Sequence, residues 1–168
     1  ENDGTALVAG NICNSWVYDP NNKEESSKIV RQMYEEQVRW AAEEGVDFII
    51  AETIEYVGEA LIALEVIKKY KLPAFITFGA TYDRSKDDYD WIEGCKILEE
   101  HGADVIGFNC IRGPETLLPL LKDLRKAVSI PIAAQPVPYH TTPKRPFQFL
   151  EYKGEKAFPV LLDRLLCT

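Results

Sequence analysis

The sequence has little basic charge, no long apolar run and no leader-like start. It holds 19 Lys and Arg against 27 Asp and Glu, a formal net charge of −8, and an acidic surface repels the phosphate backbone of nucleic acid. No stretch approaches the roughly 20 apolar residues of a membrane-spanning helix, and the first residues lack the basic-then-apolar pattern of a signal peptide. We therefore expect a cytoplasmic protein that binds small molecules or proteins, with no nucleic acid and no membrane.

Paired cysteines and glycine-rich nucleotide loops are also missing. The four cysteines, at 13, 95, 110 and 167, lie far apart, which is typical of free thiols in a reducing compartment. No G-x-G-x-x-G or Walker-type loop follows the first apolar segment, which weakens dinucleotide-binding and P-loop interpretations. The whole sequence is 46% apolar and 27% charged. This composition indicates one globular domain over residues 1–168.

Five short apolar segments alternate with longer amphipathic ones. The apolar segments predict strands buried on both faces, and they read ALVAGNI, DFIIAET, PAFITFGA, DVIGFNC and IPIAAQP. The amphipathic segments predict helices near Ser27–Glu44 and Val57–Tyr70. Gly45 and Gly102 suit the left-handed position that ends a helix. In the second helix three charged side chains are expected to face solvent: Glu59, Lys68 and Lys69.

The repeat length is compatible with two α/β folds, and the polar residues favour one of them. Strand starts are spaced by about 30 residues, as in a doubly wound sheet or an eight-fold barrel. Barrel enzymes gather functional residues at the C-terminal ends of several strands, where this sequence has Asn11, Glu52, Cys110 and Gln135. A whole (β/α)8 barrel takes about 250 residues. We therefore predict a partial TIM barrel of about five βα units.

Two of these strand ends carry side chains that could bind a ligand or a metal, a carboxylate and a thiol. Glu52 follows the apolar run FIIA, so a buried carboxylate there needs a cation, either a ligand ammonium or Arg112; a solvated carboxylate is the alternative. Cys110 is placed to meet ligand or metal at a barrel rim, although a lone cysteine is more often a small buried hydrophobe. Trp16 and Tyr18 either line a cation-receiving pocket or pack their loop.

Four motifs come in a recognisable order and spacing: ALVAGNI, VDFIIAETIEY, ADVIGFNC and AAQPVPYHT. Together they resemble the homocysteine S-methyltransferase family, which includes betaine–homocysteine methyltransferase. The resemblance implies a (β/α)8 barrel whose zinc is held by three cysteine thiolates, one from G-x-N-C and two adjacent ones on the last strand. It implies that Cys110 is the first zinc ligand and that Glu52 receives the amino group of homocysteine. It also implies three further substrate-binding residues: Thr53, Asn109 and Gln135.

The reaction that the resemblance implies is transfer of a methyl group from an onium donor, betaine or S-methylmethionine, to the thiol of homocysteine, giving methionine. A zinc ion that binds this thiol lowers its pKa, so that a thiolate exists at neutral pH. Members that use betaine have a tyrosine after the glutamate. This sequence has Thr53 there, as do members that use S-methylmethionine, which leaves the donor open.

Two motifs of the family are absent from the sequence. Neither the adjacent cysteine pair nor the acidic glycine-rich motif of the first strand occurs, so the chain resembles strands three to seven of the barrel and is expected to be inactive alone. A non-catalytic, barrel-derived module for protein contacts is the alternative. Five strands leave two open edges, ALVAGNI and IPIAAQP, through which we expect the isolated chain to associate, with itself or with other strands.

Overall fold

The computed structural model of the protein describes residues 4, 6–138, 141–144, 146, 151–152 and 155–156. Cys167 lies outside these residues. No helix among them is long and apolar enough to cross a membrane. Strands and helices alternate in the order β1 Ala9–Cys13, the 3-10 helix η1 Pro20–Asn22, α1 Lys23–Glu43, β2 Phe48–Ile54, α2 Val57–Lys69, β3 Ala74–Phe78, α3 Trp91–Glu100, β4 Val105–Asn109, α4 Pro114–Ala127, β5 Ile132–Gln135, β6 Glu151–Tyr152 and β7 Glu155–Lys156.

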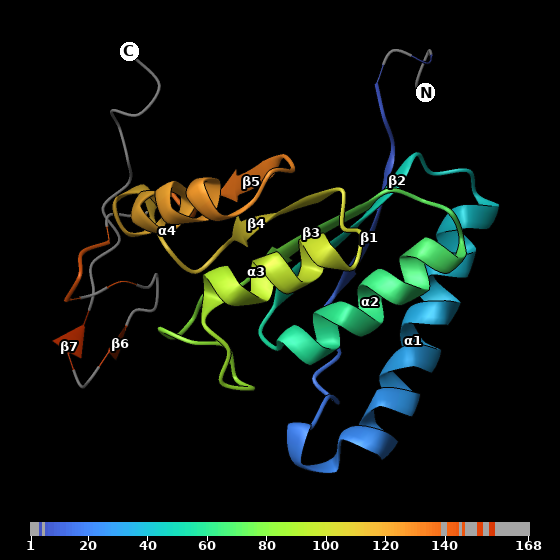
Figure 1. The fold of residues 1–168 in the computed structure, drawn as a ribbon, viewed down its shortest axis with the longest axis horizontal. Helices are drawn as coiled ribbons and strands as arrows, with labels where there is room; N and C mark the ends of the chain where they lie inside the picture. Colours follow the sequence, from blue (N-terminus) through green and yellow to red (C-terminus); the bar gives the residue numbers. More distant parts are fainter. Residues whose placement is uncertain are drawn as a thin grey trace.

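The strands β1 to β5 form one parallel sheet in the sequential order β1-β2-β3-β4-β5. A doubly wound sheet reverses its strand order at a switch point, and no reversal occurs between β1 and β5. The helices α1 to α4 pack against the sheet, and each contacts its neighbour in sequence (Figure 1). These are consecutive units of a (β/α)8 barrel, so the predicted partial barrel is confirmed.

Local sequence signals determine where the helices begin and end. α3 begins after Asp90, whose carboxylate accepts hydrogen bonds from two first-turn N–H groups at 2.9 and 3.2 Å. Pro114 fits the first turn of α4, where an N–H is not needed. Gly45 and Gly102 follow α1 and α3 with φ of +77° and +91°, left-handed values that glycine adopts at little cost. The predicted helix ends at both glycines are confirmed.

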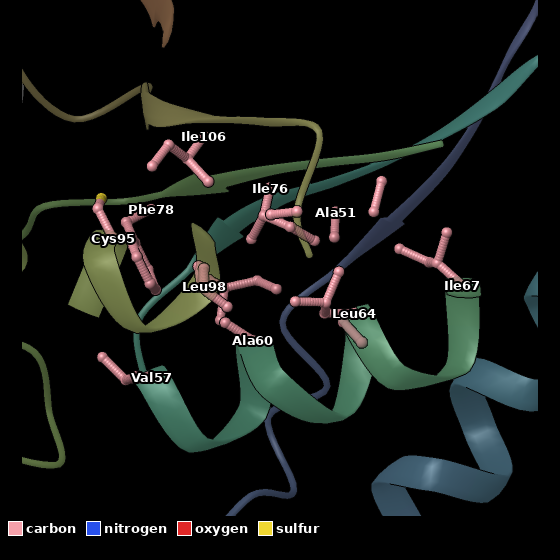
Figure 2. Close-up of a cluster of buried hydrophobic side chains, with 14 of the residues drawn as sticks. Ala51, Val57, Ala60, Leu64, Ile67, Ile76, Phe78, Cys95, Leu98 and Ile106 are labelled. Atoms are coloured by element: carbon pink, nitrogen blue, oxygen red, sulfur yellow. The ribbon is translucent and has the colours of Figure 1, made fainter. Parts of the chain in front are cut away.

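The core lies between the sheet and the helices (Figure 2). Ile76, Phe78 and Ile106 point from the strands toward α2 and α3 and are fully buried. Burying each such side chain contributes about 1.5–3 kcal/mol. Burial also raises the pKa of the Cys95 thiol, so this cysteine is a small core hydrophobe. The helices contribute the buried residues that face the strands: Ala60, Leu64, Ile67, Cys95 and Leu98.

No helix of the described residues covers the other face of the sheet. Phe48, Phe75 and Val105 lie there and are half-buried. They line a pocket of about 500 Å³ at the N-terminal ends of the strands, in which the ring centroids of Phe48 and Phe75 are 6.4 Å apart. In a whole barrel this face forms the filled interior. The described part of the chain therefore supplies one wall of a barrel.

Candidate functional site

The predicted site residues lie on the C-terminal rim of the sheet, the edge at which all five parallel strands end. Glu52 and Thr53 belong to the end of β2, and Asn109 ends β4 with Cys110 directly after it. Gln135 ends β5, where the strand register pairs it with Asn109. The structure thus brings residues that are more than 80 positions apart in the sequence to one edge.

Glu52 is half-buried, and its carboxylate forms a hydrogen bond but no ion pair with another described residue. Asn11 Nδ2, on the neighbouring strand β1, donates to Glu52 Oε1 over 3.0 Å. Arg112 instead donates from Nε to the carbonyl of Ala80 at 2.8 Å and from Nη2 to that of Tyr82 at 3.2 Å, and burial lowers its pKa. The interpretation of Arg112 as the cation beside Glu52 is therefore wrong.

Thr53 and Asn109 join β2 to β4, two strands that β3 separates in the sheet. The Thr53 N–H donates to Asn109 Oδ1 at 2.8 Å, and Asn109 Nδ2 donates to Thr53 Oγ1 at 2.6 Å. Asn109 is buried, so both ends of its amide need such partners. Thr53 has a φ of +56°, an uncommon value for a residue other than glycine. The two hydrogen bonds hold residue 53 in one orientation on the rim.

Cys110 begins a tight turn after β4. Its φ is +55° and that of Ile111 is +60°, and a β-branched residue in this left-handed region is an outlier. The Cys110 N–H donates to the Gln135 carbonyl at 2.9 Å, and the Ile111 side chain is buried. Backbone strain of this kind costs about 1–3 kcal/mol per residue and clusters at functional sites. The turn fixes the half-buried Cys110 side chain at the rim.

The predicted metal ligand, Cys110, belongs to no three-ligand group in the described part of the chain. Within that part, no group of three or more His, Cys, Asp or Glu side chains could hold a metal ion. A structural or catalytic zinc takes at least three protein ligands. Cys13, at the end of β1, is exposed. The described residues therefore do not fit a complete zinc site, and Cys110 is at most one ligand of it.

Trp16 is exposed, but a cation of the chain itself faces its ring. Lys86 Nζ lies 5.7 Å from the ring centroids of both Trp16 and Tyr56, and it forms an ion pair with Glu55. Burial lowers the pKa of Lys86, but the hydrogen bond and the charge of Glu55 outweigh this effect and raise it above its ordinary value. Tyr18 is buried and packs edge-on against Tyr56 at 5.2 Å, as the packing alternative predicted.

Glu59 contradicts the sequence-based prediction that it faces solvent, since it is 1% exposed. Its Oε1 accepts from the N–H and the hydroxyl of Ser15 at 2.7 and 2.5 Å and lies 2.9 Å from Tyr34 Oη. Burial and the charge of Glu59 raise the pKa of Tyr34. Helical periodicity does not reveal this role. Its partners Ser15 and Tyr34 lie 44 and 25 positions away in the sequence, so no local pattern indicates the contact.

Comparisons with known proteins agree with this geometry. The homocysteine S-methyltransferase family model matches residues 2–156. The S-methylmethionine–homocysteine S-methyltransferase of Pongo abelii is 33% identical over 143 residues, which cover 82% of this chain and 39% of that protein. The betaine–homocysteine S-methyltransferase 1 of Danio rerio is 32% identical over 147 residues, 83% of this chain and 36% of that protein. The chain thus spans little more than a third of the length of these relatives.

Among solved structures, the homocysteine methyltransferase MmuM from Escherichia coli superposes with a TM-score of 0.65. The match covers 78% of this chain and 48% of that chain at 19% sequence identity, a level at which the likeness concerns the fold. The family model, by contrast, covers nearly the whole sequence. The chain belongs to the homocysteine S-methyltransferase family.

Proposed function

We propose that the protein containing this chain transfers a methyl group from an onium donor to the thiol of homocysteine and so forms methionine. The observation that carries the proposal is Glu52, a half-buried carboxylate on the rim that is held by a neutral amide and by no cation of the described residues. A partly exposed carboxylate with acceptor positions to spare is open to a ligand that carries a compensating charge. The ammonium group of an amino-acid substrate would supply that charge, and membership of the family supports homocysteine as the amino acid.

In this proposal the residues of the rim bind and orient the thiol substrate. Glu52 receives the ammonium group, while Thr53, Asn109 and Gln135 form the adjoining wall, in which Asn109 fixes Thr53 and pairs with Gln135 in the register. Methyl transfer needs sulfur and methyl carbon in line and in contact, so much of the rate depends on holding both substrates in place. A rim fixed by interstrand hydrogen bonds supports such a role.

S-methylmethionine is the donor that we propose. The chain is 33% and 34% identical to the S-methylmethionine–homocysteine S-methyltransferases of Pongo abelii and Mus musculus. The Thr53 side chain packs against Gly79 and accepts from Asn109, so position 53 offers no aromatic face to a trimethylammonium group. The ring of Trp16 is already faced by Lys86. These contacts favour a donor other than betaine.

Zinc is the metal that we propose for the full-length protein, with Cys110 as one thiolate ligand. The strained turn at Cys110 supports this role, because it fixes the thiol at the rim, directly after the strand whose Asn109 contacts Thr53 beside Glu52. Since the described residues contain no three-ligand group, at least one further ligand must come from outside them.

Methionine formation by the full-length protein tests the proposed function. With L-homocysteine we expect methionine from S-methylmethionine and a kcat/KM with betaine at least about tenfold lower. Glu52→Gln keeps the shape of the side chain but removes its charge, and it should lower kcat/KM by about a hundredfold, or about 3 kcal/mol. Glu65→Gln, an exposed glutamate on α2, is the matched control and should behave as wild type. No methionine from either donor would contradict the proposal.

A non-catalytic module for protein contacts is the second candidate. The observation that favours it is that the described residues hold no group of three metal ligands. The intact mass of the protein isolated from its native source separates the two candidates. A native protein of 168 residues would favour the module, and a native protein long enough to complete the barrel would favour the enzyme.

A further inference from the structure

In the described part of the chain, Asn11 is the side chain that contacts the Glu52 carboxylate. The strand register places Asn11 opposite Ile50 and Cys13 opposite Glu52, so the Asn11 amide reaches diagonally along the same face to Glu52 Oε1 at 3.0 Å. Asn11 is exposed. Its amide therefore does not pack in the core. The hydrogen bond to Glu52 is the side-chain contact that Asn11 forms with the described residues.

We propose that Asn11 is a positioning residue that orients the Glu52 carboxylate for the ammonium group of the substrate, an inference that rests on the proposed function. A carboxylate only accepts hydrogen bonds, and an amide donates only through its NH2 group. The contact therefore fixes the orientation of both side chains. It also leaves the second carboxylate oxygen and most acceptor positions of the first available to a ligand.

The neutrality of Asn11 matters as much as its position. An Arg or Lys at this place would also hold Glu52, but it would neutralise the carboxylate and compete with the incoming ammonium. An amide holds the carboxylate and leaves its full charge for the ligand. Without it, the Glu52 side chain would populate several rotamers, and ligand binding would have to bear the entropy of selecting one.

Kinetics of Asn11→Ala in the full-length protein test this role, with L-homocysteine and its des-amino analogue 4-mercaptobutanoate as alternative thiol substrates. We expect a KM for homocysteine about tenfold higher than wild type, with little change in kcat and an unchanged KM for the analogue, because the analogue has no ammonium group. Asn11→Gln keeps an amide donor and should recover part of the loss. Ala9→Ser, on the same strand but outside the contact, should match wild type. An unchanged KM for homocysteine, or equal rises for both thiols, would overturn the proposal.

The contact can also be measured without turnover, through the side-chain amide resonances of Asn11 in protein labelled with 15N-asparagine. The amide proton that faces Glu52 should have a different chemical shift in Glu52→Gln than in wild type, because this variant keeps the shape of the side chain but removes its charge. If the wild-type protein does not methylate homocysteine, the proposed function fails, and these resonances alone decide whether Asn11 holds Glu52. If the chemical shifts of the Asn11 amide are the same with and without the charge of Glu52, the positioning role is overturned.

Discussion

Glu52 and Glu59 show how the surroundings of one residue type decide its role. Glu59 is 1% exposed, and one of its oxygens is surrounded by the N–H and hydroxyl of Ser15 and the hydroxyl of Tyr34. Glu52 is half-buried and, among the described residues, accepts one hydrogen bond, from Asn11. A carboxylate with a full set of internal donors stabilises the fold, whereas one with acceptor positions to spare is suited to a ligand.

Cys110 should decide the zinc content of the full-length protein. If its thiolate is a ligand, Cys110→Ala leaves the metal with too few ligands, and bound zinc should fall from about one equivalent to less than about 0.2. Cys13→Ala is the matched control, because Cys13 is an exposed cysteine at the end of a neighbouring strand of the same sheet. Metal analysis after gel filtration measures both variants. Unchanged zinc in Cys110→Ala would contradict the assignment.

Tyr34 should make the folded state less stable at alkaline pH. Burial and the charge of Glu59 raise its pKa above the ordinary 10.0, so folded Tyr34 keeps a proton that the unfolded chain loses. Above about pH 10 the unfolded state therefore binds fewer protons, and the free energy of unfolding declines as pH rises; below that pH the contribution is constant. Tyr34→Phe has no such proton. Its stability, measured by urea denaturation, should decline less steeply from about pH 9.5 to 11, and parallel declines would refute the prediction.

At the scale of elements, β4 and β5 approach each other backbone to backbone at Gly107. A Cβ at this position would lie 2.1 Å from the carbonyl oxygen of Ala133, a separation that only movement of a strand could relieve. The same pair of strands carries the hydrogen bond from the Cys110 N–H to the Gln135 carbonyl. The absence of a side chain at residue 107 thus sets the spacing of the rim around Cys110.

Gly107→Ala should therefore destabilise the protein strongly. We expect the free energy of unfolding to fall by about 3 kcal/mol or more, because the clash is with main chain rather than with a flexible side chain. Gly45→Ala, which meets open space at a φ of +77°, should cost about 1 kcal/mol. Chemical denaturation of both variants measures the difference. Equal losses would show that β5 moves freely away from β4.

The elements themselves could be predicted from the sequence, but most contacts between their ends could not. Apolar runs and helix-ending glycines are local patterns, and they predicted the parallel strands and the ends of α1 and α3. The bridge from Thr53 to Asn109 spans 56 positions and depends on a left-handed φ at residue 53, which no local pattern indicates. The contact of Lys86 with Trp16 joins two loops whose paths only the folded sheet defines.

At the scale of the whole molecule, the described strands form a wall with two edges. β1 and β5 each pair on one side only within this sheet, and the apolar side chains of Phe48, Phe75 and Val105 are half-buried on its uncovered face. In water, unpaired strand edges and apolar faces of this kind favour association. The predicted need for further strands, from the same chain or another, follows from this geometry.

The isolated 168-residue chain should consequently associate. Sedimentation velocity at low micromolar concentration is expected to show species larger than a monomer, because an open barrel wall leaves backbone donors and acceptors unpaired at β1 and β5. Ala9→Lys places a charge on the edge strand β1 and should reduce the associated fraction. A compact monomer that unfolds cooperatively would refute the prediction.

The sequential order of the strands also has a consequence for biosynthesis. Each strand pairs with the one made just before it, and each helix packs on the preceding helix, so ordering one unit requires only the unit made before it. A ribosome adding about 5–20 residues per second makes a unit of about 30 residues in roughly 2–6 seconds, whereas a helix forms in about a microsecond. The wall can therefore grow unit by unit as the nascent chain emerges, and a paused ribosome would carry an ordered stub instead of an unfolded tail.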